Sequence, residues 1–508
     1  MRGPWIRMDL LSELKREIRR ATKLLDLAVK RDVPSEIEFS QLPSGRCVER
    51  RGERLLLSES KTRGWLKHVL SKEALVSLMV PEVDEVPQVH DLAWVYSGAP
   101  KEVWLTCRVP PEGPFHDYDP YELLSLLPKR ERLRALGTLV RILNVAAKRG
   151  TLEFPMYLAL LNRVVSLNIG FSESDRKLVR IISENPAVTS DHMKRMCMGG
   201  SAISRSVRKL RTLGMLFGPE NVDHWRLGLS TLVVTFPDRR ECRRAFWRFP
   251  YTYNMFIPIS TEVDVHTYLS YPSKGMNDLL SLKELGLDIA LVKETSLMLN
   301  LDPPGDLFEA VGSALALSGE SGDEPGMEGS SFPGASSPPV RVDRTDIRIL
   351  NMVLEKGRVS ASMLSEEGIH GAKTRLRKLR DSYIVRNYYF IGFPRGVEKT
   401  IVKVRRGIVD MAFLSKVLGS SGSAVIQHLE GESSYLIGIL MVEPRVKGDL
   451  FRILRAIYGD DLIVAEDFID VEPGWRFPVE LWDEESQTFL WKDPLDMLRR
   501  ELASCIGG

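Results

Sequence analysis

Cysteine is scarce in this chain and is not spaced for metal binding. The five cysteines are scattered over 508 residues without a C-x-x-C pair, which argues against a zinc site and against a disulfide framework. No apolar run approaches the roughly 18–20 residues that span a membrane, and the N-terminus lacks the apolar core of a signal peptide. We therefore expect a cytoplasmic protein that binds no metal, no cofactor and no membrane.

The chain also lacks a strong net charge and the short motifs of common enzymes. It has 70 Lys and Arg against 68 Asp and Glu, a net charge of +2, so any basic surface must be local. No nucleophile elbow, HExxH motif or dinucleotide fingerprint occurs. Residues 115–119 gather a histidine and two carboxylates, but Asp119 and Pro120 are better explained as the start of a helix. We expect no catalytic residues.

One segment occurs twice, which is the strongest pattern in the sequence. Residues 174–189 (SDRKLVRIISENPAVT) align with 345–360 (TDIRILNMVLEKGRVS) at an offset of 171. Residues 206–211 (SVRKLR) align with 375–380 (RLRKLR) at an offset of 169. Each copy contains a helix with an acidic cap, a second helix, a turn and a basic helix, and this order predicts a helix-turn-helix.

The basic helix of each copy is amphipathic. Apolar residues recur at i, i+4 and i+7, starting at Ile203 and at Ala372, so one face is expected to pack on a core. The opposite face suits phosphates and guanine edges, although a solvated polar face is the alternative. The predicted DNA-binding residues are Ser204, Arg205, Arg208, Lys209, Arg211, Lys373, Thr374, Arg375, Arg377, Lys378 and Arg380. Of these, Arg211, Lys373, Arg375 and Arg380 are expected mainly to hold the DNA backbone.

Short apolar segments separated by turns follow each basic helix and predict a two-stranded wing in each copy. Beyond each wing, the patterns predict the order strand, helix, strand, strand, helix, strand, which is the ferredoxin-like plan. In the first copy the strands are expected at 230–236, 253–260, 263–270 and 288–297, with helices at 238–248 and 275–286. In the second copy the strands are expected at 400–405, 423–430, 434–442 and 462–471, with helices at 408–418 and 446–458. The predicted fold class is therefore α+β.

Seven segments result from these patterns. A Gly-, Pro- and Ser-rich stretch at 318–339 predicts a flexible linker between the copies, and a hairpin-like pattern at 46–58 lies in an otherwise unassigned N-terminal region. The expected segments are an N-terminal α+β domain (1–170), a first winged helix (171–229), a first βαββαβ domain (230–300), a linker (301–342), a second winged helix (343–397), a second βαββαβ domain (398–475) and a C-terminal tail (476–508).

A winged helix followed by a βαββαβ domain resembles the leucine-responsive, or feast/famine (Lrp/AsnC-type), transcription regulators. Residues 343–350 (DRTDIRIL), 358–360 (RVS) and 377–379 (RKL) carry the likeness, whereas the Gly-Leu-Ser that usually precedes the basic helix is missing from both copies. The resemblance implies binding of double-stranded DNA through the winged helices and self-association through the βαββαβ domains. It also implies, for many members, a small-molecule effector.

Two other functions stay open. Winged helices also bind proteins, so a non-catalytic adaptor is one alternative. Sirohaem decarboxylases share the winged-helix and βαββαβ plan, and residues 249–255 (FPYTYNM) loosely resemble their Trp-Pro-Tyr-Asn segment. The favoured prediction is a DNA-binding transcription regulator that is not an enzyme.

Overall fold

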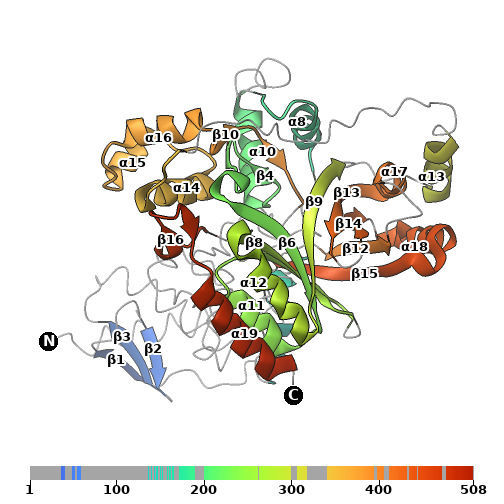
Figure 1. The fold of residues 1–508 in the computed structure, drawn as a ribbon, viewed down its shortest axis with the longest axis horizontal. Coiled ribbons are helices and arrows are strands. Elements are labelled where there is room, and N and C mark those ends of the chain that lie inside the picture. The colour runs from blue at the N-terminus through green and yellow to red at the C-terminus, as the bar shows by residue number, and fades with distance from the viewer. Residues whose placement is uncertain are drawn as a thin grey trace. The chain divides into compact units, whose positions relative to one another are not determined.

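The computed structural model divides the chain into two units, residues 1–170 and 171–508 (Figure 1). In the first unit it describes three strands and isolated positions between 136 and 164. In the second unit it describes residues 171–506 except 189–199, 261–262, 299–305, 317–339, 394–397, 406–410, 432–433, 443 and 472–475. The predicted linker core at 318–339 and the turn at 198–199 therefore lie outside the described residues. Among the described residues, no helix is long and apolar enough to cross a bilayer.

The described strands of the first unit form a three-stranded sheet. Strand β2 (Val48–Arg51) pairs antiparallel with β3 (Arg54–Ser58), which confirms the hairpin expected at 46–58. Strand β1 (Glu36–Ser40) pairs parallel with the other edge of β3. This third strand was not predicted, because its partner β3 lies beyond the intervening strand β2 in the chain.

The repeat begins with the same helix start in both copies. Helix α8 (Glu173–Glu184) starts at a capping box between Ser172 and Asp175, and α14 (Arg344–Lys356) starts at one between Asp343 and Asp346. A capping box satisfies backbone N–H groups that a helix leaves unpaired at its start. The following helices are α10 (Gly200–Thr212) in the first copy, and α15 (Ala361–Glu366) and α16 (Ala372–Asp381) in the second.

The wing strands pair between the copies. Strand β4 (Leu216–Phe217) pairs with β11 (Phe390–Ile391), and β5 (Glu220–Val222) pairs with β10 (Val385–Asn387). The expectation of a separate two-stranded wing in each copy is therefore wrong. Two- and three-residue strands have few ladder bonds of their own, and pairing across the copies satisfies their exposed edges. Gly218 adopts φ +99° here, and a Cβ at this position would lie 2.4 Å from the carbonyl oxygen of Tyr388.

The strand and helix order expected after each wing is present in both halves. The strands are β6 (Leu229–Phe236), β7 (Thr252–Pro258), β8 (Val265–Pro272), β9 (Asp288–Met298), β12 (Glu398–Arg405), β13 (Gly422–Glu430), β14 (Ser434–Val442) and β15 (Leu462–Val471). The helices are α11 (Arg240–Arg248), η3 (Ser273–Gly275), α12 (Met276–Leu280), η4 (Ser281–Leu285), α17 (Met411–Ser421), α18 (Pro444–Tyr458) and η5 (Gly459–Asp461).

The two halves join into one closed barrel. The strand order is β12-β14-β13-β9-β6-β8-β7-β15, and β15 pairs back onto β12. The junctions between the halves are β13 with β9 and β15 with β7. The chain therefore does not contain two separate sheets, because each half uses the other to pair both of its edge strands.

Helices cover the outside of the barrel. On the second half, α17 and α18 pack on a buried cluster that includes Val402, Leu414 and Leu450. The same cluster contains Leu307 and Val311 from α13 (Leu307–Ala316). Residues 307–316 were expected to belong to the flexible linker, and that expectation is wrong, because their apolar side chains complete this core.

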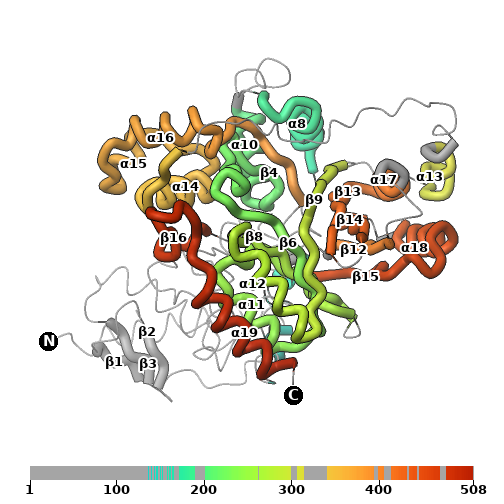
Figure 2. Tube along the Cα trace, in the orientation of Figure 1, coloured from blue at the N-terminus to red at the C-terminus, as the bar shows by residue number. Residues whose placement is uncertain are grey.

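The C-terminal segment is folded, although a tail was expected there. After η6 (Val479–Leu481), strands β16 (Trp482–Asp483) and β17 (Thr488–Phe489) form a hairpin, and α19 (Lys492–Ile506) packs along α11. Figure 2 shows this red helix beside the green α11. A disulfide joins Cys242 of α11 to Cys505 of α19. The scattered cysteines predicted no disulfide framework, because two cysteines separated by 263 residues have no recognisable spacing.

Polar side chains lie inside the barrel. The Tyr268 hydroxyl donates to Oε1 of Gln427 at 2.6 Å and thus links the two halves. His266 Nδ1 lies 3.0 Å from the Thr235 hydroxyl, and its Nε2 has no hydrogen-bond partner among the described residues. Burial, and then the nearby charge of Lys403, lower the pKa of His266 to about 3. The folded barrel therefore holds this histidine neutral.

We predict that His266 makes the folded state sensitive to acid. An unfolded histidine has a pKa of about 6.5, so the stability from the neutral folded form is complete above that pH. It is lost as the pH falls toward about 3. Between pH 6 and pH 4, the free energy of unfolding of the wild type should fall by about 1 kcal/mol more per pH unit than that of His266→Gln. Urea unfolding at several pH values measures this. His370→Gln, at an exposed position, is the control and should keep the wild-type dependence on pH. Equal slopes of unfolding free energy against pH for the wild type and His266→Gln would disprove the assignment.

We also predict that the disulfide stabilises the docked C-terminal helix. A cross-link that closes a loop of this length removes much of the freedom of the unfolded chain. Dithiothreitol should lower the unfolding free energy of the wild type by about 2–4 kcal/mol. Without reductant, Cys505→Ser should already have the unfolding free energy of the reduced wild type. Dithiothreitol should not change it further. An unchanged urea midpoint for the reduced wild type would contradict this prediction.

Candidate nucleic-acid interface

Both basic helices bury the apolar stripe that the sequence predicts. In α10, Ile203 is 5% exposed and Leu210 is fully buried. In α16, Ala372, Leu376 and Leu379 are all buried. The 3.6-residue period therefore placed the opposite face of each helix correctly toward solvent.

Five of the eleven predicted DNA-binding residues are instead engaged within the protein. Lys209 pairs with Asp175 at 2.8 Å. Arg375 pairs with Asp343 at 2.7 Å and with Asp346 at 2.8 Å, and Lys378 also pairs with Asp346. Arg211 donates to the Gly218 carbonyl oxygen at 2.6 Å, and Arg380 pairs with Glu220. Lys209, Arg211, Arg375, Lys378 and Arg380 therefore have partners within the protein, and their contact with DNA stays a prediction.

The internal pairs serve the same purpose in both copies. The offsets of the repeat place Asp175 at the position of Asp346, and Lys209 at the position of Lys378. Both carboxylates are buried, with 3% and 0% of their side chains exposed. A buried carboxylate requires a cation or several hydrogen bonds close by. The lysine thus fastens the basic helix to the first helix of its own copy.

Two carboxylates at the helix starts show the electrostatic effect of these cations. Partial burial raises the pKa of Asp175, but the hydrogen bonds from Lys209 and Ser206 outweigh it and leave that pKa below its ordinary value. Burial likewise raises the pKa of Asp343, and the hydrogen bond from Arg375 reverses the shift. Both groups are therefore held ionised, which keeps the helix starts capped.

Arg211 and Arg380 occupy the matching position near the end of each basic helix, and both reach the wings. Glu220 of the first copy accepts from Arg380 of the second copy and also from the backbone N–H of Val359 at 3.2 Å. The Asn221 side chain donates to the carbonyl oxygen of Tyr388 at 2.6 Å. These contacts and the paired wing strands fix the two copies against one another.

The remaining six predicted residues form a matched pair of exposed faces. Offset by 169, Ser204 corresponds to Lys373, Arg205 to Thr374, and Arg208 to Arg377, and all six side chains are exposed. Within each helix the three positions are i, i+1 and i+4, so they lie on one side. In Figure 1, α8, α10 and α14 to α16 gather at one end of the second unit, and α11, α12 and α19 at the other.

The segment that loosely resembles the decarboxylase motif is part of a core. Phe249 and Tyr251 are buried, and the Tyr251 hydroxyl donates to the carbonyl oxygen of Leu490. Their rings pack edge to face with centroids 5.4 Å apart. In the part of the chain that the structure describes, no group of three or more His, Cys, Asp or Glu could hold a metal ion.

No family model matches the chain, and no curated protein matches its sequence. Among solved structures, the crystal structure of the siroheme decarboxylase NirDL is similar to this chain, with 12% sequence identity and a TM-score of 0.30. The match covers 66% of this chain and 100% of that chain. The crystal structure of NirDL with an iron-uroporphyrin III analogue is also similar, with 12% identity and a TM-score of 0.31. That match covers 65% of this chain and 99% of that chain. Likeness at this level assigns no function to this chain.

We predict that Lys378 and its neighbour Arg377 differ sharply in their effect on stability. Lys378→Ala removes one cation from a fully buried carboxylate, and should cost about 1–3 kcal/mol of unfolding free energy. Arg377→Ala removes an exposed side chain, and should change stability by less than about 0.5 kcal/mol. Urea unfolding of the two variants tests this. Equal losses would show that Lys378 does not hold the helix in place.

Proposed function

We propose that this chain is a DNA-binding transcription regulator that uses α10 and α16 as its two recognition helices. The observation that carries the proposal is the matched exposed face of the repeat. After the internally paired cations are set aside, Arg205 and Arg208 of one copy and Lys373 and Arg377 of the other still face solvent. A helix that is fastened on one side and cationic on the other suits a negatively charged partner.

The chemistry of the two faces fits duplex DNA. The major groove admits an α-helix, and arginine can pair with the O6 and N7 acceptors of guanine. Hydroxyl groups such as those of Ser204 and Thr374 can donate to phosphates or to base edges. We assign Arg208 and Arg377 the central role, because they occupy the same position in both copies.

The tandem arrangement implies one site with two unlike halves. The wings hold both recognition helices within a single chain, so binding of two half-sites does not require a second protein molecule. The two faces differ where Ser204 is replaced by Lys373 and Arg205 by Thr374. We therefore propose a DNA site whose halves are not identical, unlike the palindromes that match symmetric dimers.

We predict that substitution of both central arginines weakens DNA binding and its dependence on salt. Each lost phosphate contact should reduce the slope of log K against log salt by about 0.9. The Arg208→Ala/Arg377→Ala variant should thus lose up to about two units of slope. Fluorescence anisotropy with a pool of duplex fragments between low and moderate salt measures it.

The control for this experiment is Arg244→Ala/Arg500→Ala, which removes two exposed cations from the barrel helices α11 and α19. It should bind DNA as the wild type does. Equal effects of the two double variants would indicate binding through net charge alone. Absence of binding by the wild type at low salt would refute the proposed function.

One observation favours the adaptor alternative. Trp225 is 73% exposed and Tyr383 is 55% exposed, and a backbone hydrogen bond between Asp223 and Ile384 joins the segments that carry them. Exposed aromatic residues of this kind are common anchors of protein interfaces. If the wild type fails to bind DNA, a Trp225→Ala variant tests for lost association with a co-purifying protein.

One observation bears on the decarboxylase-like alternative. The Nε2 atom of His266 has no hydrogen-bond partner in the described part of the chain and is chemically able to ligate iron, but the histidine is only 2% exposed. An absorbance titration with an iron porphyrin provides the test. A Soret shift that is lost in His266→Gln would support a tetrapyrrole enzyme, and an unchanged spectrum would remove this alternative.

A further inference from the structure

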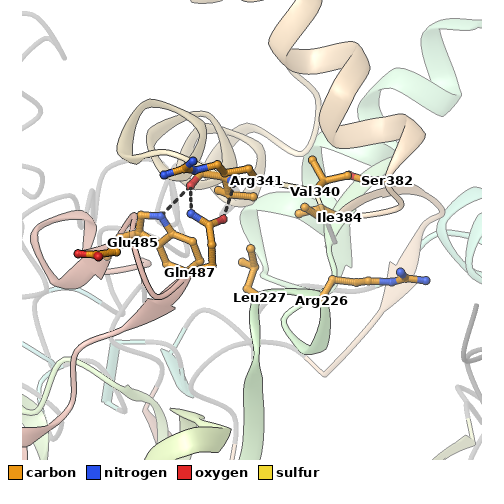
Figure 3. A pocket seen from close by; sticks show the side chains of 10 residues that line it. Arg226, Leu227, Val340, Arg341, Ser382, Ile384, Glu485 and Gln487 are labelled. Carbon is orange, nitrogen blue, oxygen red and sulfur yellow. Dashed lines mark hydrogen bonds between the residues drawn. The ribbon is translucent and has the colours of Figure 1, made fainter. Parts of the chain in front are cut away.

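A cavity of about 580 Å³ lies beside the second recognition helix. Its walls come from three separate parts of the second unit, shown in Figure 3. These are η2 (Trp225–Leu227), residues 340–342 with the end of α16, and the β16–β17 hairpin. Cavities of this size are typical of binding sites for small molecules.

The inner wall is apolar and rigidly held. Leu227, Val342, Ile384 and Trp482 are all buried. Gln487 accepts from the backbone N–H of Val342 at 2.7 Å and donates back to its carbonyl oxygen at 3.0 Å. The Trp482 indole N–H donates to the same oxygen at 3.0 Å. The dashed lines of Figure 3 show these bonds, which engage the Gln487 amide, the Trp482 indole N–H and the Val342 backbone.

Charged residues also line the cavity. These are Arg226, Arg341 and Glu485, and in Figure 3 the Arg226 side chain points away from Glu485. The Arg341 side chain is exposed. In the described residues it has no ion pair, whereas its backbone carbonyl oxygen accepts from Lys378. An exposed guanidinium above an apolar wall offers several donors to an anion.

We propose that this cavity binds a small organic anion with an apolar body. The anionic group pairs with Arg341, and the apolar part lies against Leu227, Ile384 and Trp482. Such a ligand would bridge the C-terminal hairpin and the second helix-turn-helix. Lys378 of α16 donates a hydrogen bond to the backbone carbonyl oxygen of Arg341. The residue that pairs with the ligand is therefore bonded directly to this helix. The site itself does not depend on the proposed binding of DNA.

The test uses two dyes of similar shape and different charge, without DNA. 8-Anilinonaphthalene-1-sulfonate carries one negative charge, and N-phenyl-1-naphthylamine is neutral. The wild type should bind the sulfonate at one saturable site, measured by dye fluorescence and isothermal calorimetry. Arg341→Gln should lower the affinity for the sulfonate by about tenfold, the effect of losing one charge-assisted pair. It should leave the affinity for the neutral dye unchanged.

Two further variants complete the design. Ile384→Trp fills the cavity and should weaken both dyes, with folding verified by a thermal melt. Arg348→Gln removes a different exposed arginine, on α14, and should change neither. Sulfonate affinity that is unchanged in both Arg341→Gln and Ile384→Trp would overturn the proposal, as would an equal loss in Arg348→Gln. Because no DNA is present, either result is distinct from failure of the proposed DNA binding.

Discussion

The pairing of strand edges is the constraint on which this structure depends. Each βαββαβ half has two outer strands whose backbone groups need partners, and each wing has strands too short to be stable alone. One arrangement satisfies both needs. The barrel closes through β13 with β9 and β15 with β7, and the wings pair β4 with β11 and β5 with β10. The tandem repeat is therefore a single folding unit, in which each copy completes the other.

A second constraint decides which cations remain available to a partner. The capping boxes place Asp175 and Asp346 at the starts of α8 and α14 with almost no exposure. Their charge must be balanced inside the protein, and the basic helix is the nearest source of cations. Lys209 and Lys378 supply this balance. The eleven predicted residues are thus divided into a set that is bonded within the protein and a set with exposed side chains.

Much of the fold could be predicted from the sequence, because periodicity and repeats report local structure. The strand expected at 434–442 has the observed bounds of β14, and the one expected at 462–471 has those of β15. The pairing of the wings, the helix at 307–316 and the disulfide between Cys242 and Cys505 could not be predicted, since they join segments far apart in the chain. For the candidate site, the sequence predicted the buried and exposed faces of the two basic helices but not the ion pairs within the protein. A helical pattern gives the face of Lys378 but not the buried carboxylate that binds it.

The two basic helices α10 and α16 differ between the copies in a way that separates fold-holding residues from exposed ones. Residues that hold the fold match across the repeat, as the pairs Asp175/Asp346 and Lys209/Lys378 show. Residues on the exposed face match only at Arg208 and Arg377, and differ at the other two positions, Ser204/Lys373 and Arg205/Thr374. In a symmetric dimer of identical chains, both faces must change together. Two copies in one chain are free of this requirement, so each face can be adapted to its own half of the proposed, unequal DNA site while the shared scaffold is kept.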